Sequence, residues 1–554
     1  RSHKVNTVFI IGVNDGSFPS VNKDEGFFND ADREYLKQEG IELAKSTLDK
    51  LYEDNFNIYK AFTTAENQIY LSYVSSDCDG KSLRPSILIG KIKKMYPKLQ
   101  EKSDVIYKEY KVENKISTYE QLIENISRLR NKEKIDDVWY YIYQYYKSQS
   151  DWNKKLEADL KGLEYTNLPE KIKKENLEKL YGNTLNTSIS RLEKYRSCPF
   201  SYYLQYGLKL KEKEQLKIQS FNTGSFMHET IDEFFEYVRQ EGLSLAELEE
   251  EQITRIVSEI IENNLKMSKN YIFTATAKYK VLVRRLKKIV SKALKYIIET
   301  IIYSDFSIEG TEVEFGKNGR YKPIVLEIGE GKKVEITGKI DRIDTSKNED
   351  GKYLRIIDYK SSAKNIDLNE VYAGLQIQLL TYTDAICREE DIMPAGVFYF
   401  SLLEQMVKAD KKMTEDEIEE TIRKNFKMKG LIIADVKIIK MNDNTLKTGN
   451  SKLVPAALTT SGTINEKWTN GVKAEEFRTL QEYIYKTIKD ISKEILSGNI
   501  DLKPYYKKGK TPCQYCEYKA VCGFNSRQEN NTYNYIEQKS KDEILLKMKK
   551  NLEE

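Results

Sequence analysis

The sequence predicts an α/β protein built from several domains. Short apolar or alternating runs, typical of strands, are interspersed with longer amphipathic stretches, typical of helices. The chain has 554 residues, enough for about three to five domains at ~100 to 200 residues each. Hydrophobic residues make up 40% and charged residues 32% of the chain, which supplies several apolar cores and excludes a wholly disordered polymer.

Charge and hydropathy limit the kinds of function that the chain can have. Lys and Arg total 90 against 86 Asp and Glu, a net charge of only +4, so a nucleic-acid surface would have to come from local patches. No apolar run approaches the roughly 20 residues that span a bilayer, and the start lacks a signal-peptide pattern, so we expect no membrane contact and a cytoplasmic location. The first methionine is Met95, and we therefore expect the downstream part of a longer protein.

The first hundred residues are predicted to be the end of an α/β domain. Val8–Ile11 reads as a buried strand that stops at a glycine-containing turn, a helical stretch covers about 30–62, and Gln68–Val74 reads as a second strand.

Residues 101–183 are predicted to form a helical connector. The pattern there is helical and polar, with an aromatic cluster from Trp139 to Tyr146. Aromatic side chains at helical spacing more often fill a core than stack on bases, so we interpret the cluster as core.

A further domain is predicted over residues 184–525, followed by a C-terminal tail, 526–554. Helices are expected at about 188–206, 222–241, 245–265, 276–302, 369–387 and 474–498. Strands are expected at Thr311–Phe315, Lys333–Ile343, Tyr353–Tyr359 and Gly396–Ser401. With the helix at 369–387, the order is βββαβ, and residues 410–475 are mixed.

Two of these strands form a hairpin that carries charged residues at suggestive positions. Asp358 and Lys360 are two residues apart, so strand alternation points both to one face, and Asp341 can lie opposite them. Two adjacent carboxylates repel unless a cation such as Mg²⁺ or Mn²⁺ lies between them, and a lysine there can orient water or stabilise charge on a phosphate. The alternative is a surface hairpin with solvated charges.

The surrounding motifs resemble the RecB-like branch of the PD-(D/E)XK nuclease superfamily. The matching residues are Gly338-x-x-Asp341-Arg342-x-Asp344, Ile356 to Ser361, Gln378-x-x-x-Tyr382, Gly224 to Glu229 and, more loosely, Glu312-x-x-Phe315. The resemblance implies a restriction-endonuclease-like fold in which His228, Asp341 and Asp358, with the Ile357 carbonyl, hold Mg²⁺ or Mn²⁺. It also implies that Lys360 is the catalytic lysine and that Gln378 and Tyr382 align the site and the DNA. Glu312 is the implied acidic ligand on the preceding strand, with Glu314 as the alternative.

Four cysteines form a second candidate site. Cys513, Cys516 and Cys522 are closely spaced, whereas Cys198 lies over three hundred residues earlier, before Pro199. Thiolates at such spacing can bind zinc or an iron–sulfur cluster, and composition does not choose between them. The pattern from Ser190 to Phe200, with the trailing cysteines, resembles the iron–sulfur-stapled nuclease of AddB-type proteins, which implies a 4Fe–4S cluster.

The amino-terminal residues also resemble a known family. Val8 to Pro19 resembles a late motif of UvrD-like superfamily 1 helicases, and Ala61 to Asn67 resembles their final motif, with Thr64 where that family has an arginine. No Gly-x-x-x-x-Gly-Lys-[Ser/Thr] loop occurs in the sequence. We therefore expect an inactive helicase-like region, with ATP bound only by an upstream part or by a partner subunit.

Together these motifs resemble the carboxy-terminal half of AddB-type subunits of ATP-dependent helicase–nucleases. The resemblance implies a metal-dependent DNA exonuclease in double-strand break repair, acting on the 5′-ended strand at DNA ends and on single-stranded DNA beside an AddA-like partner. The alternatives are a stand-alone iron–sulfur exonuclease of the Cas4 type, which lacks the helicase-like amino terminus, and a non-catalytic DNA-binding scaffold. A basic helix at 278–300 suits either a phosphate-tracking groove or a solvated amphipathic face.

Overall fold

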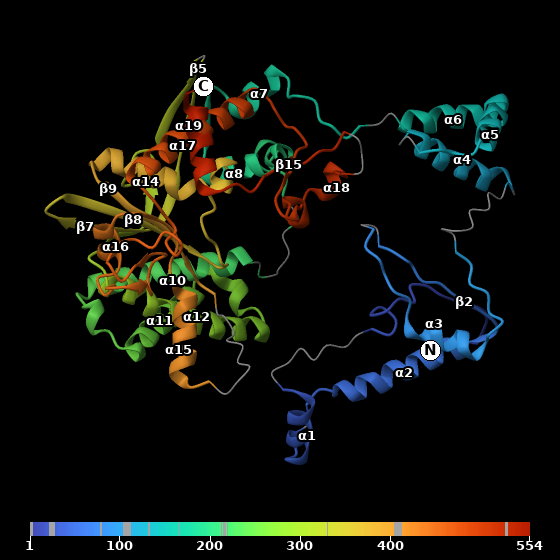
Figure 1. Ribbon diagram of the computed structural model, residues 1–554, viewed down its shortest axis with the longest axis horizontal. Helices are drawn as coiled ribbons and strands as arrows, with labels where there is room; N and C mark the ends of the chain where they lie inside the picture. Colours follow the sequence, from blue (N-terminus) through green and yellow to red (C-terminus); the bar gives the residue numbers. More distant parts are fainter. Residues whose placement is uncertain are drawn as a thin grey trace. The chain divides into compact units, whose positions relative to one another are not determined.

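The computed structural model describes residues 4–20, 28–41, 43–77, 80–103, 112, 114–130, 133–163, 166–211, 213, 218, 220–329, 331–403, 413–526 and 530–553. The chain separates into two compact units, Arg1–Leu163 and Glu164–Glu554 (Figure 1). None of the described helices combines the length and the apolar character that crossing a membrane requires.

The first unit begins with two parallel strands, β1 (Val5–Ile10) and β2 (Ala65–Leu71). The predicted helical stretch between them is two helices, α1 (Asp30–Gln38) and α2 (Thr47–Thr63), because Ser46 starts α2 with a reciprocal capping box to Asp49. Helix α3 (Ile87–Met95) follows.

Three helices complete the first unit: α4 (Lys115–Arg130), α5 (Val138–Ser148) and α6 (Ser150–Leu163). Trp139 and Tyr146, at the two ends of the predicted aromatic cluster, are each 1% exposed and pack with Tyr119 in a small core. Tyr140 and Tyr141, in contrast, are exposed. The interpretation of the cluster as core therefore holds for one face of α5.

The second unit is built on a mixed six-stranded sheet of order β13-β10-β9-β8-β7-β4. The strands are β4 (Ser307–Phe315), β7 (Gly338–Asn348), β8 (Gly351–Lys360), β9 (Met393–Ser401), β10 (Lys429–Ile433) and β13 (Gly471–Val472). Strand β7 is antiparallel to both β4 and β8, and β8 runs parallel to β9. The predicted βββαβ order is thus present, from the edge strand β4 through β7 and β8 to β9.

One predicted strand, Lys333–Ile343, is in fact two strands in different sheets. Its first part is β6 (Lys332–Ile336), which pairs with β3 (Thr184–Thr187) and β5 (Ile324–Gly329), and its second part begins β7. The chain changes sheet at Gly338, where a β-carbon would lie 1.8 Å from the Tyr382 hydroxyl oxygen. The alternation of apolar and polar residues gives no sign of such a change, because the same period of two runs through β6 and the start of β7.

Helices cover both faces of the sheet (Figure 1). One apolar core contains residues of α8 (Ile189–Ser197), α14 (Gln378–Glu390), α17 (Ala474–Leu496) and α19 (Lys541–Glu553). The other contains residues of α10 (Ser220–Gln240), α11 (Glu250–Leu265), α12 (Ala277–Ile302) and α15 (Glu415–Phe426). The remaining described helices of four or more residues are α7 (Lys174–Tyr181), α9 (Pro199–Tyr202), α13 (Leu368–Tyr372), α16 (Val436–Asn442) and α18 (Lys519–Cys522), with a π-helical turn at Tyr203–Gly207 and 3-10 turns at Ser268–Thr274 and Pro512–Tyr515.

Three predicted helices differ from the observed ones: two are interrupted in the structure, and one starts later than predicted. The helix expected at 188–206 is interrupted at Cys198, which is extended because the following Pro199 excludes it from helical conformation. The helix expected at 369–387 is two helices, α13 and α14, separated by Gly374 at φ +76°. The helix expected from 245 begins at Glu250, after a short 3-10 turn.

We predict that Gly338→Ala destabilises the protein by about 1–3 kcal/mol, because the added methyl group overpacks against Tyr382. Urea unfolding of the single variants and the double variant with Tyr382→Ala measures the coupling. The free energy of unfolding that Gly338→Ala removes should be smaller by at least about 0.5 kcal/mol in the Tyr382→Ala background, where the tyrosine ring is absent. Strictly additive losses would contradict this explanation of the glycine.

Candidate functional site

Three carboxylates lie in one row across neighbouring strands of the large sheet. On β4 and β7, Thr311 pairs with Arg342 and Val313 with Ile340, which places Glu312 opposite Asp341. On β7 and β8, Arg342 pairs with Ile357, so the next position places Asp341 opposite Asp358. The predicted opposition of Asp341 and Asp358 across the hairpin is therefore present, and Glu312 extends the row by one strand.

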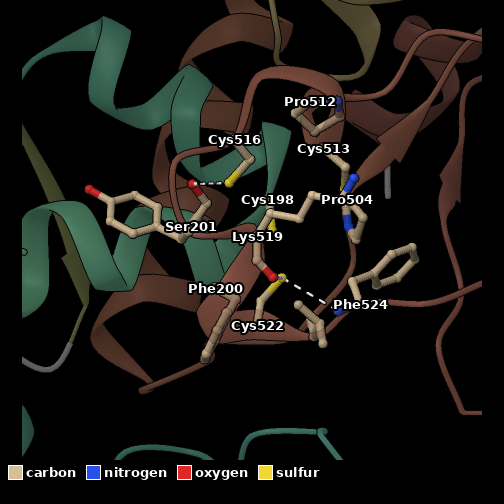
Figure 2. A pocket seen from close by; sticks show the side chains of 12 residues that line it. Cys198, Phe200, Ser201, Pro504, Pro512, Cys513, Cys516, Lys519, Cys522 and Phe524 are labelled. Atoms are coloured by element: carbon tan, nitrogen blue, oxygen red, sulfur yellow. Dashed lines mark hydrogen bonds between the residues drawn. The ribbon is translucent and has the colours of Figure 1, made fainter. Parts of the chain in front are cut away.

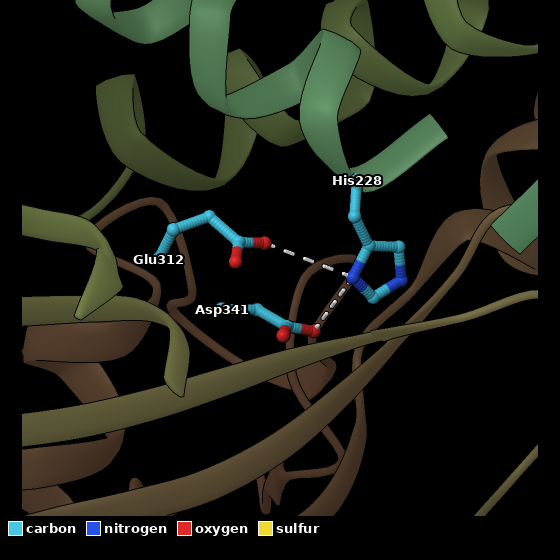
Figure 3. A group of neighbouring side chains, drawn as sticks. All are labelled: His228, Glu312 and Asp341. Carbon is cyan, nitrogen blue, oxygen red and sulfur yellow. Dashed lines mark ion pairs between the residues drawn. The ribbon is translucent and has the colours of Figure 1, made fainter. Parts of the chain in front are cut away.

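His228 on α10 faces this row from outside the sheet (Figure 3). Its Nδ1 lies 3.4 Å from Asp341 Oδ2 and 3.9 Å from Glu312 Oε1. Ligand atoms of these three residues all lie within 4.8 Å of one another, and each side chain is partly buried. Imidazole nitrogen and carboxylate oxygen form a donor set suited to a divalent cation such as Mn²⁺ or Mg²⁺.

The structure distinguishes Glu312 from Glu314. Glu312 has a left-handed backbone conformation, φ +48°, and lies at the histidine, whereas Glu314 is exposed and absent from the group of potential ligands. Burial raises the pKa of Glu312, although Lys339 Nζ lies 2.7 Å from its Oε2 and acts in the opposite sense. Lys339 was not anticipated, although its position two residues before Asp341 places it on the same face of β7.

Asp358 and Lys360 form a pair beside the His228 group. Lys360 Nζ lies 2.5 Å from Asp358 Oδ2. Burial and the neighbouring Asp341 raise the pKa of Asp358 to about 6, and Lys360 counteracts part of this rise. Asp358 is not among the three residues whose ligand atoms cluster most closely, so in this structure its closest ionic partner is the lysine.

The carboxylates of the site act strongly on His228. Burial lowers the pKa of His228, but the hydrogen bond to Asp341 and the charges of Asp341, Asp358 and Glu312 outweigh burial, so that its pKa is raised. Asp341 Oδ2 also accepts the Tyr359 backbone N–H at 2.7 Å, which fixes its carboxylate. A positive charge placed among these groups would relieve their repulsion, and the residues present therefore fit a divalent metal.

The second aspartate of the Asp341-Arg342-x-Asp344 motif has a different environment. Asp344 is fully buried between two arginines, with Oδ1 2.9 Å from Arg342 Nε and Oδ2 2.8 Å from Arg355 Nε. Arg355 also donates to the Thr300 carbonyl oxygen on α12 at 2.9 Å. Strand alternation thus divides the motif between a potential metal ligand on one face and a buried structural network on the other.

Helix α14 brings Gln378 and Tyr382 toward the site. Tyr382 is 2% exposed, its ring stacks on Phe315 with centroids 5.2 Å apart, and its hydroxyl reaches the backbone of Gly338. Its contacts therefore support β7 from within the core. Gln378 is half-buried in the first turn of α14.

Glu193 on α8 caps the start of α14. Its Oε1 accepts the backbone N–H groups of Ile377 at 2.8 Å and Gln378 at 3.0 Å, although 184 residues separate Glu193 from Ile377. Burial raises the pKa of Glu193 to about 7, opposed first by the charge of Lys364. A cap from so distant a residue leaves no local sequence signal, and it was not predicted.

The four predicted cysteines line one cavity (Figure 2). Its other walls include Phe200, Leu502, Pro504 and Phe524. Cys198 is 7% exposed, and burial raises the pKa of its thiol to about 11. Among the described residues, no three cysteine sulfur atoms lie within 4.8 Å of one another. Thiols from the two ends of the domain thus converge on an apolar cavity that fits a thiolate-bound metal centre.

The basic helix predicted at 278–300 is α12. Its apolar face, including Val283, Leu286 and Val290, is buried in the core. Lys287 and Lys295 form ion pairs with acidic residues, whereas Lys280, Arg284 and Lys288 are exposed. Both interpretations of its basic face, a solvated surface and a phosphate-binding surface, fit this arrangement.

A mixed sheet that aligns three carboxylates, one of them paired with a lysine, beside a histidine offers the kind of donor set that metal-dependent phosphodiester hydrolysis uses. The model of the PD-(D/E)XK nuclease superfamily matches residues 186–523, and the chain belongs to this superfamily. A second model, the ATP-dependent helicase/deoxyribonuclease AddB fifth domain, matches residues 109–162 in the helical connector.

Similar proteins include three that are named as subunits of an ATP-dependent helicase/deoxyribonuclease. That of Clostridium novyi is 38% identical over all of this chain and half of its own length. That of Acetivibrio thermocellus is 37% identical over 100% of this chain and 49% of its own. That of Thermoanaerobacter pseudethanolicus is 36% identical over 98% and 48%. The chain thus spans about half the length of the curated relatives it matches.

We predict that Glu193→Ala destabilises the protein by about 0.5–2 kcal/mol, because two N–H groups at the start of α14 lose their acceptor. The midpoint of urea unfolding measures the change. Glu193→Gln is the matched control, since its side-chain oxygen can still accept both hydrogen bonds, and it should lose less than half as much. Equal losses in the two variants would contradict the capping role.

Proposed function

We propose that the chain is the nuclease-bearing half of an AddB-like subunit and that it hydrolyses DNA phosphodiester bonds with a divalent metal. The observation that carries this proposal is the row of Glu312, Asp341 and Asp358, with His228 and Lys360 beside it. A surface hairpin with solvated charges would not explain three partly or fully buried carboxylates on adjacent strands.

His228, Glu312, Asp341 and Asp358 would hold the metal, and the contribution of the Ile357 carbonyl stays a prediction. Bound Mg²⁺ or Mn²⁺ supplies Lewis-acid polarisation of a phosphate oxygen and a lower pKa for the attacking water. The Lys360 ammonium, held by Asp358, would orient that water or stabilise negative charge on the phosphate. The Tyr359 N–H holds the Asp341 carboxylate, and Tyr382 packs against β7 at Gly338. Helix α14, with Gln378 and Tyr382, would thereby align the site and the DNA.

We infer the wider role from the relatives, whose names describe a subunit of an ATP-dependent helicase/deoxyribonuclease. The chain would act as an exonuclease on DNA ends and single strands, on the 5′-ended strand, in double-strand break repair, beside an AddA-like helicase partner. The parallel β1–β2 pair and its helices fit the end of a helicase-like domain without a phosphate loop. ATP would be bound upstream of this region or by the partner.

We also propose that the cysteine cavity holds a 4Fe–4S cluster. Four sulfur ligands at tetrahedral zinc, with Zn–S bonds of about 2.3 Å, would lie about 3.8 Å from one another. In the described part of the chain no three cysteine sulfur atoms come within 4.8 Å of one another, and this favours a larger centre. A cluster there would join Cys198 to Cys513, Cys516 and Cys522 and close a loop of more than three hundred residues.

We predict that Asp341→Asn lowers the rate of metal-dependent DNA cleavage by at least about 100-fold, since even residues outside the ligand shell commonly alter metal affinity by 10- to 100-fold. Binding of a single-stranded oligonucleotide should persist. Asp350→Asn, at the exposed turn of the same hairpin, is the control and should cleave normally. Normal cleavage by Asp341→Asn would refute the assignment, and loss of cleavage in both variants would point to damage of the hairpin.

We predict that the purified protein shows the broad visible absorbance of a thiolate-bound iron–sulfur centre and contains about four irons per chain. Cys516→Ser should lose both signals, whereas Cys387→Ser, on α14 and outside the cavity, should keep them. A colourless protein containing stoichiometric zinc would refute the cluster without affecting the nuclease assignment.

A further inference from the structure

A second ammonium group lies against the same aromatic ring as Lys360, the proposed catalytic lysine. Lys364 is in the loop after β8, and its Nζ lies 4.9 Å from the centroid of the Tyr399 ring. Lys360 Nζ lies 5.9 Å from the centroid of the same ring. Two cations thus share one aromatic side chain at the edge of the proposed nuclease site.

The position of Tyr399 is fixed by the sheet. Asp358 pairs with Tyr399 in the parallel register of β8 and β9, so the tyrosine continues the row of Glu312, Asp341 and Asp358 onto a fourth strand. Its side chain is 5% exposed, which excludes it as a platform on which a base could stack. Its ring instead supports the two lysines at a set distance from the carboxylates, through cation–π attraction and packing.

The two lysines differ in how their charge is balanced. Lys360 is paired with Asp358, whereas Lys364 forms no ion pair with any of the described carboxylates and acts on Glu193 and Asp358 only from a greater distance. The nearby Glu193 directs its Oε1 to the start of α14. Lys364 is half-buried, and its ammonium and that of Lys360 repel each other beside the Tyr399 ring. An anionic group bound there would relieve this repulsion.

We propose that Lys364, supported by Tyr399, is a phosphate-binding residue that holds a backbone phosphate of the DNA strand next to the scissile one. This inference rests on the proposed nuclease function, because the ligand is the substrate of that site. Lys360 would act at the reacting phosphate, and Lys364 would hold the neighbouring phosphate and so fix the register of the strand over the carboxylate row. Its contribution would be to binding and alignment, independent of base sequence.

The test measures binding of a short single-stranded oligonucleotide to the full chain over a range of salt concentrations, in the Asp341→Asn background so that the DNA stays intact. Adding Lys364→Met removes the charge and keeps the aliphatic stem. The slope of log K against log salt should fall by about 0.7, the value for one single-strand phosphate contact, and affinity should weaken. Lys364→Arg should restore the slope.

Lys347→Met is the matched control, because Lys347 is an exposed lysine near the turn of the β7–β8 hairpin, away from the carboxylate row. Its slope should equal that of the parent. An unchanged slope in Lys364→Met, an equal change in Lys347→Met, or absence of DNA binding by the chain would overturn the proposal. Cleavage by the chain with Asp341 intact decides the nuclease function separately, since a protein that binds DNA through Lys364 without cutting it would refute only that function.

Discussion

Repulsion between carboxylates on neighbouring strands is the constraint on which the second unit depends. Backbone pairing places Glu312, Asp341 and Asp358 opposite one another, and like charges directly opposite across strands are destabilising. The surrounding groups all reduce this repulsion: Lys339 beside Glu312, Lys360 beside Asp358, His228 and the Tyr359 N–H beside Asp341. A divalent cation among the same oxygens would do so most strongly.

The opposite face of the hairpin explains why the strands keep their pairing despite the repulsion between the carboxylates. Arg342, Asp344 and Arg355 form a fully buried ionic network, and Arg355 ties it to α12. Removing one member of such a network leaves an uncompensated buried charge, so its register is strongly specified. The same register then aligns the carboxylates on the other face. The stability of the hairpin and the geometry of the site therefore have a common origin in strand alternation.

The sequence was most informative where local periodicity decides the structure. The alternation of Asp341, Asp358 and Lys360 follows from a period of two, and it correctly brought these residues together. Pro199 predicts the break in the helix at Cys198, although the helical pattern on both sides of this break conceals it. The change of sheet at Gly338, the left-handed Glu312 and the cap from Glu193 depend on contacts between distant segments. Periodicity within one segment carries no information about such contacts.

The contacts of helix α8 and of the residues just after it determine when the second unit can fold during synthesis. Tyr195 donates to the Asn499 carbonyl oxygen, Arg196 pairs with Glu494, and the Phe200 N–H donates to the Asp501 carbonyl oxygen. During synthesis on the ribosome, α8 emerges about three hundred residues before these partners, so its native surroundings cannot form until they too have emerged. Folding of this unit is therefore tied to near-completion of its own translation. Nascent chains that stop earlier expose the apolar face of α8, a surface that chaperones and proteases recognise.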